Sequence, residues 1–378
     1  MVIPSGTTST SLNSLISQGK WGDDDGDGQG TNGVTATGSI SLAIKDKNGS
    51  TVNRSDTLDI CKAPYKVTLD STGGSLTTQY GVPNSSRFYG GTVDYYITLP
   101  SPPVICSVMP NLGYGTGQYA GPSNIWNPEK GFLVQSTNPS SYNLNFPTTG
   151  SDGLYFDLDI GGIDASQLSW TVNTIGSLGA TVSWRLPVSD PSNSYIDRWI
   201  RDKSKNVTRV TLNGPKASSS QISSSNPGSL TRPSLPQTFE LVGRDSNGNE
   251  VRYGFKLKQW FVNRGNQEKS YSDQSAWCRS LGYRLSKVRD LTNAVRTDNP
   301  PISGAAPSSS GNRYQRHIGA GFFTEWGYMS HYAAAGFVNY IYWTSDASGS
   351  DQFYVYSSYG GVHSFSASSS RVAVCTAP

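Results

Sequence analysis

Apolar and polar side chains alternate along much of this chain, which is the pattern of β-strands with one buried face. In residues 39–45 the apolar positions Ile40, Leu42 and Ile44 share one face, and the sequence Lys-Asn-Gly-Ser that follows predicts a turn. The same alternation returns in residues 65–69 and 93–99. The pattern therefore predicts many short strands joined by turns.

The spacing of these strands predicts an immunoglobulin-like β-sandwich over residues 38–109. A second β-sandwich domain is predicted over residues 110–251, with strands at 153–160, 168–172, 180–184, 206–212 and 238–243. The last of these runs into a hairpin turn at 245–249 and a strand over 252–262. Residues 218–236, rich in Ser and Pro, are expected to form a long surface loop, and residues 1–37 a flexible leader or linker rich in Gly, Ser and Asp.

Residues 252–378 combine helical and strand patterns. Ser272 is expected to cap a short helix that Gly282 ends, because glycine readily adopts the left-handed conformation after a helix. A second helix is expected from Ser286, with Val288, Leu291 and Val295 on one stripe. Alternating strands follow near residues 341–345, 352–356, 361–365 and 371–375. The last third of the chain is therefore predicted to be a mixed α and β module.

Composition supports a folded, mostly β protein. The chain has 378 residues, 41 Gly and 21 Pro, and only 15% of its residues are charged. Its 21 Tyr and 9 Trp supply the burial that a disordered chain lacks. Length favours several domains, because a single core seldom exceeds roughly 250 residues.

Charge and hydropathy exclude some partners. The net charge is +3, and no Lys or Arg occurs between Gly321 and Ser370. Nucleic acid is therefore not expected as a partner. No stretch reaches the roughly 20 apolar residues of a membrane span, and no apolar signal core follows Met1. We therefore expect the sequence to be an excised or processed segment.

Four cysteines in a β-rich chain are typical of an oxidising exterior, although they allow three pairings. Spacing favours Cys61 with Cys106 and Cys278 with Cys375, because each pair then falls inside one predicted domain. None of the four has the CxxC spacing of zinc or redox sites.

A partial calcium motif lies near the start of the chain. Asp23, Asp25 and Asp27 alternate and precede Gly28, as in loops that wrap a hard cation. The twelfth position, where such loops need a Glu, is Val34. Two interpretations stay open, a calcium site and a solvated linker, and the predicted function requires no cofactor.

Catalysis is not expected. His317, His331 and His363 lack metal-ligand spacing, and a lone His is more often structural than catalytic. Asp157 and Asp159 alternate on one strand, whereas paired glycosidase carboxylates usually come from separate segments across a cleft.

Three segments resemble a C-type-lectin-like domain with an α+β fold. They are Ser-Asp-Gln-Ser-Ala-Trp-Cys-Arg-Ser-Leu-Gly-Tyr-Arg-Leu at 272–285, Tyr-Trp-Thr-Ser at 342–345 and the terminal Val-Ala-Val-Cys. β-sandwich domains followed by such a domain resemble the passenger regions of bacterial invasin and intimin adhesins. The stretch from Gly153 through the segment Arg-Pro-Ser-Leu-Pro-Gln-Thr-Phe-Glu-Leu-Val-Gly-Arg-Asp at 232–245 looks like their enterobacterial relatives, and the resemblance covers about residues 110–378 well.

This resemblance implies a rigid β stalk that projects a lectin-like tip from the bacterial outer membrane, as in virulence-associated cell adhesion. In the best-known relatives the tip binds a protein rather than a sugar. The sequence lacks the Glu-Pro-Asn, Gln-Pro-Asp and Trp-Asn-Asp motifs of calcium-dependent sugar sites, and Trp343 precedes Thr344 and Ser345. Calcium-mediated sugar binding in the tip is therefore not expected.

Aromatic residues concentrate at the predicted tip. Residues 322–365 contain fourteen in forty-four positions, interleaved with small polar residues as in antibody paratopes. Strand alternation assigns Trp343, Phe353 and one of Tyr342 and Tyr354 to the core. Turn-rich segments hold the residues expected to be exposed, and these are the candidate ligand-binding residues Trp326, Tyr328, His331, Tyr332, Asn339, Tyr340, Tyr359 and His363. Arg316 and Arg371 flank the uncharged zone, where they either anchor an acidic partner or only solubilise the rim.

Three functions remain open from the sequence. The chain is expected to be an extracellular adhesin, on the bacterial surface or secreted, that binds a protein receptor on a host or neighbouring cell. The alternatives are a calcium-independent lectin that stacks sugars on Tyr and Trp, and a self-associating structural surface protein.

Overall fold

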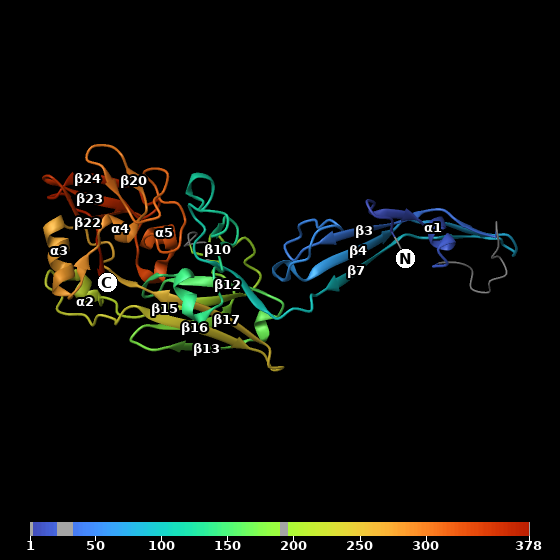
Figure 1. Cartoon of the computed structure of the whole chain (residues 1–378), viewed down its shortest axis with the longest axis horizontal. Helices are drawn as coiled ribbons and strands as arrows, with labels where there is room; N and C mark the ends of the chain where they lie inside the picture. Colours follow the sequence, from blue (N-terminus) through green and yellow to red (C-terminus); the bar gives the residue numbers. More distant parts are fainter. Residues whose placement is uncertain (1–2, 21–32, 190–195, 378) are drawn as a thin grey trace. The chain divides into compact units, whose positions relative to one another are not determined.

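The computed structural model describes residues 3–20, 33–189 and 196–377 and divides the chain into two compact units. Unit 1 spans Met1–Pro102 and unit 2 spans Pro103–Pro378. The two units are coloured blue and green to red in Figure 1, and each is described by itself. In the part of the chain that is described, no helix combines the length and the apolar character of a membrane span.

Unit 1 consists of two small antiparallel sheets (Figure 1). The first has the order β1-β3-β4-β7, with strands Ser9–Ser11, Ser39–Lys45, Tyr65–Ser71 and Gly91–Ile97. The second has the order β2-β5-β6, with strands Val34–Ala36, Gly74–Thr78 and Ser85–Phe88. The predicted strands near residues 39, 65 and 93 are therefore confirmed as β3, β4 and β7.

The predicted flexible leader is only partly described. Within it, α1 (Leu12–Ser17) begins at Ser11, whose hydroxyl accepts a hydrogen bond from the Ser14 N–H. Strand β1 pairs with β3, so the described part of the leader belongs to unit 1 rather than to a free linker. The calcium candidates Asp23, Asp25 and Asp27 lie outside the described residues.

Unit 2 begins with two sheets that face each other. The larger has the order β14-β15-β12-β8-β10-β9, with strands Gly179–Arg185, Val207–Asn213, Tyr155–Gly161, Val104–Met109, Gly131–Leu133 and Trp126–Asn127. The smaller has the order β13-β16-β17, with strands Ser169–Thr174, Gln237–Arg244 and Glu250–Leu257. The ring of Phe156 on β12 lies 5.8 Å from that of Phe255 on β17, so aromatic side chains fill the space between the sheets.

The rest of unit 2 combines helices with two further sheets. One has the order β11-β18-β25-β19, with strands Thr149–Ser151, Gln259–Asn263, Val374–Ala377 and Arg284–Leu285, and β11 runs parallel to β18. The other consists of β22 (Ile341–Ser348), β23 (Asp351–Tyr356) and β24 (Val362–Ser366), while β20 (Val295–Arg296) and β21 (Ile302–Ser303) form a separate pair. The helices are α2 (Ser219–Ser223), α3 (Tyr271–Ser280), α4 (Val288–Leu291) and α5 (Phe322–Trp326).

One hydrophobic cluster extends from Ile105 to Ala377 and joins all these layers. Strand β8 lies in unit 2, and the hairpin of β16 and β17 crosses residue 251. The boundaries predicted at 109/110 and 251/252 therefore do not coincide with the division into compact units. The mostly β fold class is confirmed.

Two helix predictions need correction. The N-cap of α3 is Ser270 rather than Ser272, because the Ser270 hydroxyl accepts the Asp273 N–H. Gly282 does adopt a positive φ, +83°, after the helix. The second helix ends at Leu291 instead of continuing through Val295, because Thr292 is extended and buried. Residues 218–236 form the expected loop, with the unpredicted short helix α2 at its start.

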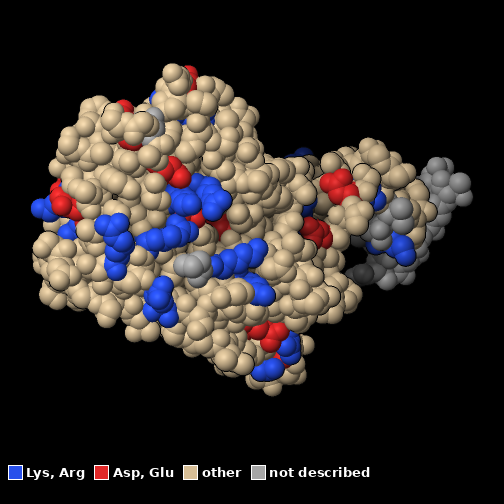
Figure 2. All heavy atoms as spheres, turned by 60° about the vertical axis from the view of Figure 1, so that its left-hand side comes forward, with Lys and Arg blue, Asp and Glu red and all other residues tan. Residues whose placement is uncertain are grey.

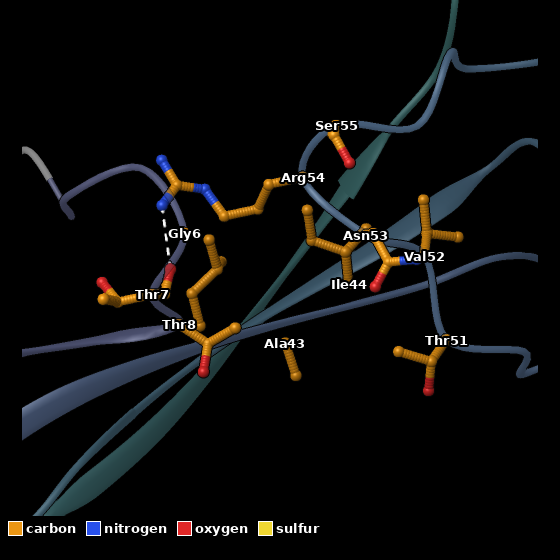
Figure 3. A pocket seen from close by; sticks show the side chains of 11 residues that line it. Gly6, Thr7, Thr8, Ala43, Ile44, Thr51, Val52, Asn53, Arg54 and Ser55 are labelled. Carbon is orange, nitrogen blue, oxygen red and sulfur yellow. Dashed lines mark hydrogen bonds between the residues drawn. The ribbon is translucent and has the colours of Figure 1, made fainter.

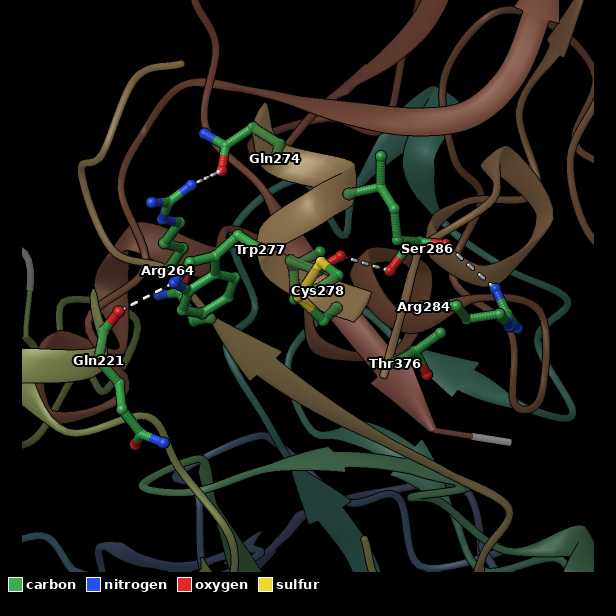
Figure 4. Close-up of a disulfide and its surroundings, with 12 residues drawn as sticks. Gln221, Arg264, Gln274, Trp277, Cys278, Arg284, Ser286 and Thr376 are labelled. Carbon is green, nitrogen blue, oxygen red and sulfur yellow. Dashed lines mark hydrogen bonds between the residues drawn. A yellow bond between two sulfur atoms is a disulfide. The ribbon is translucent and has the colours of Figure 1, made fainter. Parts of the chain in front are cut away.

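A disulfide closes unit 2. Cys278 on α3 is bonded to Cys375 on β25, and both are fully buried (Figure 4). Beside it, the Trp277 indole N–H donates to the Gln221 carbonyl at 2.9 Å, and the Arg264 guanidinium lies 4.8 Å from the Trp277 ring. This bond confirms the predicted pairing. Cys61 and Cys106 are also disulfide-bonded, so no described cysteine is free.

Candidate binding surface

Four residues expected at the surface of the tip are buried instead. Trp326, Tyr332, His331 and Arg316 all lie within the core of unit 2. The Trp326 indole N–H donates to the Thr149 carbonyl at 3.0 Å, and the Tyr332 hydroxyl accepts the Asn111 N–H at 2.7 Å. The expected exposure of these four residues is wrong, because all four are buried and the Trp326 N–H and the Tyr332 hydroxyl have hydrogen-bond partners inside the fold.

Arg316 is a structural cation. Its guanidinium donates to the backbone carbonyls of Asn111, Gly113 and Glu325, and it lies 4.6 Å from the Trp126 ring. Burial lowers the pKa of Arg316 from its ordinary value. The predicted role of Arg316 as an anchor for an acidic partner is therefore wrong, because its donors are used within the fold.

His331 packs between two aromatic rings. Its imidazole lies 4.3 Å from the Tyr328 ring and stacks on Trp199 at 6.1 Å. Burial lowers the pKa of His331 to about 4, so the ring is neutral at pH 7. His331 therefore supports the surface residue Tyr328 from beneath.

The remaining candidates reach the surface. Tyr328, Tyr340, Tyr359 and His363 are half-buried and Asn339 is exposed. Trp343 and Phe353 are buried as predicted, but Tyr342 and Tyr354 are both buried rather than one of them, so β22 and β23 bury neighbouring rings on both faces. Arg371 is half-buried with its guanidinium 5.3 Å from the Phe365 ring.

Three of these candidates belong to a continuous set of rings that we call the tyrosine row. It consists of Tyr119, Tyr114, Tyr328, Tyr359, Tyr356 and His363. Tyr114 lies at its centre, 4.9 Å from Tyr119, 5.5 Å from Tyr328 and 6.4 Å from Tyr359. Tyr359 stacks on Tyr356 at 4.9 Å, and Tyr356 lies 5.7 Å from His363.

The sequence analysis missed Tyr114 and Tyr119, which come from the other end of unit 2. Tyr114 is 38% exposed, and its φ of +50° is unusual for a residue other than glycine. The signal in the sequence was Gly-Tyr-Gly-Thr-Gly-Gln-Tyr at 113–119, in which glycines hold two tyrosines on a turn. The conformation of Tyr114 fits a residue that tertiary contacts force into place.

Hydrogen bonds fix this turn beneath the row. The Asn111 side-chain amide donates to the Tyr328 carbonyl at 2.8 Å, and the Arg316 N–H donates to the Tyr119 carbonyl at 2.9 Å. The buried guanidinium of Arg316 binds the Gly113 carbonyl from below. The rings are therefore held in place before any ligand arrives, which reduces the entropy lost on binding.

The row carries no charge at neutral pH. Burial raises the pKa of Tyr359 to about 12 and also raises the pKa of Tyr114. Burial and the nearby Arg296 lower the pKa of His363. Neutral rings with hydroxyl groups offer large contact area and hydrogen bonds, and lose little rotamer freedom on binding.

The two strand carboxylates do not form one site. Asp157 is buried and accepts hydrogen bonds from Arg209 at 2.8 and 2.9 Å, while Asp159 pairs with Lys130 at 3.8 Å. Arg209 also binds Asp197, whose carboxylate accepts the Tyr155 hydroxyl at 2.8 Å. Burial raises the pKa of Asp157, although the Arg209 hydrogen bonds oppose this shift. This network ties β12 to β15 in the core.

Metal ligands are not clustered in the described residues, and a hollow lies in unit 1. The described residues contain no group of three His, Cys, Asp or Glu side chains placed to hold a metal ion. A hollow of about 550 Å³ in unit 1 is lined by Thr8, Ile44 and Val52, among others (Figure 3). Arg54 at its rim donates to the carbonyls of Ile3, Pro4 and Thr7, so this cation stabilises the N-terminal segment (Figure 3).

No family model matches the chain, but individual proteins do. Among solved structures, it is similar to the crystal structure of invasin, described as a bacterial integrin-binding protein. That likeness has a TM-score of 0.42 and 13% identity, over 92% of this chain and 52% of that one. The C-terminal 282-residue fragment of intimin, in complex with the intimin-binding domain of its translocated receptor, has a TM-score of 0.38 and 11% identity. It covers 85% of this chain and 97% of that one.

A curated relative adds a sequence match. The inverse autotransporter adhesin YeeJ of Escherichia coli strain K12 is 30% identical over 130 residues, which is 32% of this chain. Over these 130 residues the chain is similar in sequence to part of this adhesin. The match spans 5% of the length of YeeJ. Within unit 2, the tyrosine row is the candidate binding surface.

Proposed function

We propose that this chain is the receptor-binding part of a bacterial surface adhesin, and that the tyrosine row contacts a protein on a host or neighbouring cell. The observation that carries the proposal is the clustering of six uncharged rings from distant segments on one surface of unit 2. Tyrosines with small polar neighbours are the typical composition of protein-binding surfaces. The sequence match to an adhesin supports the same function.

The proposal includes an extracellular location and no catalytic step. In this proposal recognition rests on burial of aromatic surface and requires no cofactor. Asn339 and Tyr340 come from the turn before β22 and remain candidate binding residues in this proposal.

Paired alanine substitutions test this surface. Tyr114→Ala with Tyr359→Ala removes two neighbouring rings and should weaken binding of the fluorescently labelled chain to cultured host cells by at least about tenfold. A matched control is Trp184→Ala with Leu186→Ala, since both side chains are exposed in unit 2 outside the row. Cell binding measured by flow cytometry should be unchanged in this control. Equal binding of both variants and the unmodified chain contradicts the proposal.

Self-association is a second candidate, favoured by one edge of unit 1. Strand β7 ends its sheet, and Val93, Tyr95, Tyr96 and Ile97 are all exposed. An edge strand with apolar side chains is a template for pairing with another chain. Sedimentation analysis decides between the candidates, because a strict monomer at high concentration excludes self-association. A glycan array on the same protein tests the lectin alternative.

A further inference from the structure

A second surface of unit 2 has the opposite chemistry to the tyrosine row. Figure 2 shows Lys and Arg side chains gathered on one face, with few acidic side chains between them. Five cations from four segments form what we call the basic face, and they are Arg232, Lys258, Arg284, Lys287 and Arg289.

Backbone pairing brings these segments together around β25. Arg284 on β19 is opposite Thr376 on β25, and Trp260, two residues after Lys258, is opposite Ala377 (Figure 4 shows Arg284 beside Thr376). The Tyr283 hydroxyl donates to the Thr231 carbonyl at 2.8 Å, which places Arg232 next to β19. The cations therefore gather because the fold joins four segments that lie far apart in the sequence.

One buried carboxylate organises the centre of the basic face. Asp290 accepts hydrogen bonds from Arg284 at 2.5 and 3.2 Å and from the Gln259 amide at 3.1 Å. The Lys287 N–H also donates to it, at 2.7 Å. Asp290 thus neutralises Arg284 alone. Arg232, Lys258, Lys287 and Arg289 form no ion pair with another described residue.

The basic face also lacks the apolar anchors of a protein interface. No large apolar side chain in residues 230–236, 256–260 or 283–290 is exposed, although all these residues are described. Protein hot spots need such anchors, whereas a sulfated sugar chain needs spaced cations and forked guanidinium donors. Arg232, Lys258 and Arg289 are exposed and free to supply them.

From this geometry we infer that the basic face binds a sulfated polysaccharide, independently of the tyrosine row. The charged sulfate groups repeat along such a chain and match cations that lie on separate elements of one surface. Binding releases counterions, so the affinity falls as the salt concentration rises.

Heparin serves as the probe, with surface plasmon resonance on the full chain. Arg232→Glu with Arg289→Glu should weaken heparin binding at least tenfold, and binding of the unmodified chain should weaken from about 0.05 to 0.5 M NaCl. The matched control is Arg201→Glu with Lys205→Glu, because these exposed residues lie outside the basic face and the net charge changes equally. If the reversed variant does not fold, Arg232→Gln with Arg289→Gln gives the same comparison with a smaller loss.

Several results would overturn the inference. The first is that the unmodified chain binds no heparin at low salt. The second is that the control variant loses as much heparin binding as Arg232→Glu with Arg289→Glu, and the third is that desulfated heparin binds as tightly as heparin. Equal binding of polyglutamate would assign the basic face to acidic polypeptides instead. Loss of heparin binding in Tyr114→Ala with Tyr359→Ala would contradict the independence of the two surfaces.

Discussion

Unit 1 and unit 2 bury their apolar residues to very different extents. In unit 1 the buried apolar side chains among the described residues are few, and they are Ile3, Leu12, Leu15, Ala63 and Tyr65. Unit 2 has one continuous cluster from Ile105 to Ala377. Since apolar burial is the main favourable contribution to folding, unit 2 is the more stable body.

The two units also differ in how they arrange their exposed apolar side chains. Tyr80, Val82, Tyr89 and strand β7 expose large apolar groups on unit 1, whereas unit 2 arranges its exposed rings around Tyr114 with fixed partners beneath. An aromatic-rich sequence therefore yields either small sheets with scattered exposed rings, as in unit 1, or a dense core that positions a few surface rings, as in unit 2. A binding surface needs the second arrangement.

The largest expected effect is on the core of unit 2. Phe156→Ala should lower the free energy of unfolding of unit 2 by about 3–5 kcal/mol, because it leaves a cavity between the two facing sheets. Tyr96→Ala on β7 is the counterpart in unit 1, and it should change stability by less than about 0.5 kcal/mol because the ring is 68% exposed. Denaturant unfolding measures both. Equal losses would contradict the difference between the units.

The next effect concerns the disulfide. Replacing Cys278 and Cys375 with Ala should lower the free energy of unfolding of unit 2 by about 2–4 kcal/mol, because the bond closes a long loop in the unfolded chain. Calorimetry should show a lower melting temperature for unit 2 and an unchanged transition for unit 1. A variant that melts like the unmodified chain would show that the core alone holds the two ends of unit 2 together.

The smallest effect depends on pH. Burial alone would raise the pKa of Asp290, but hydrogen bonds from Arg284 and the Lys287 N–H outweigh it and hold the pKa below its ordinary value. This contribution is present above the unfolded pKa, about 3.9, and is lost as the pH falls through the folded pKa. Asp290→Asn should cost about 1–3 kcal/mol at pH 7 and less at acidic pH. Urea unfolding at pH 7 and pH 3 checks this, and an equal cost at both would refute it.

Strand alternation predicted most of the fold, because its two-residue period depends only on local sequence. It identified β3, β4, β7 and β12 and the buried rings Trp343 and Phe353. It failed for Trp326, which is the last residue of helix α5, and for Tyr332, which follows the short helix Met329–His331. Their burial depends on Thr149 and Asn111, which lie 177 and 221 residues earlier in the sequence, and no local pattern records such contacts.

The candidate site was predicted only in part for the same reason. Tyr328, Tyr359 and His363 lie in the aromatic segment, so composition identified them. Tyr114 and Tyr119 come from a turn at the start of unit 2, and Arg316 holds that turn from inside the core. The basic face escaped notice because its cations are spread between residues 232 and 289, where no dense basic run exists.

Hydroxyl-radical footprinting of the chain, free and bound to host cells, tests the central claim most directly. We predict that binding protects Tyr114, Tyr328 and Tyr359, while Trp184 on β14 and Tyr96 on β7 stay equally reactive in both states. Protection confined to β7, with the tyrosine row unchanged, would contradict the account and assign the contact to unit 1.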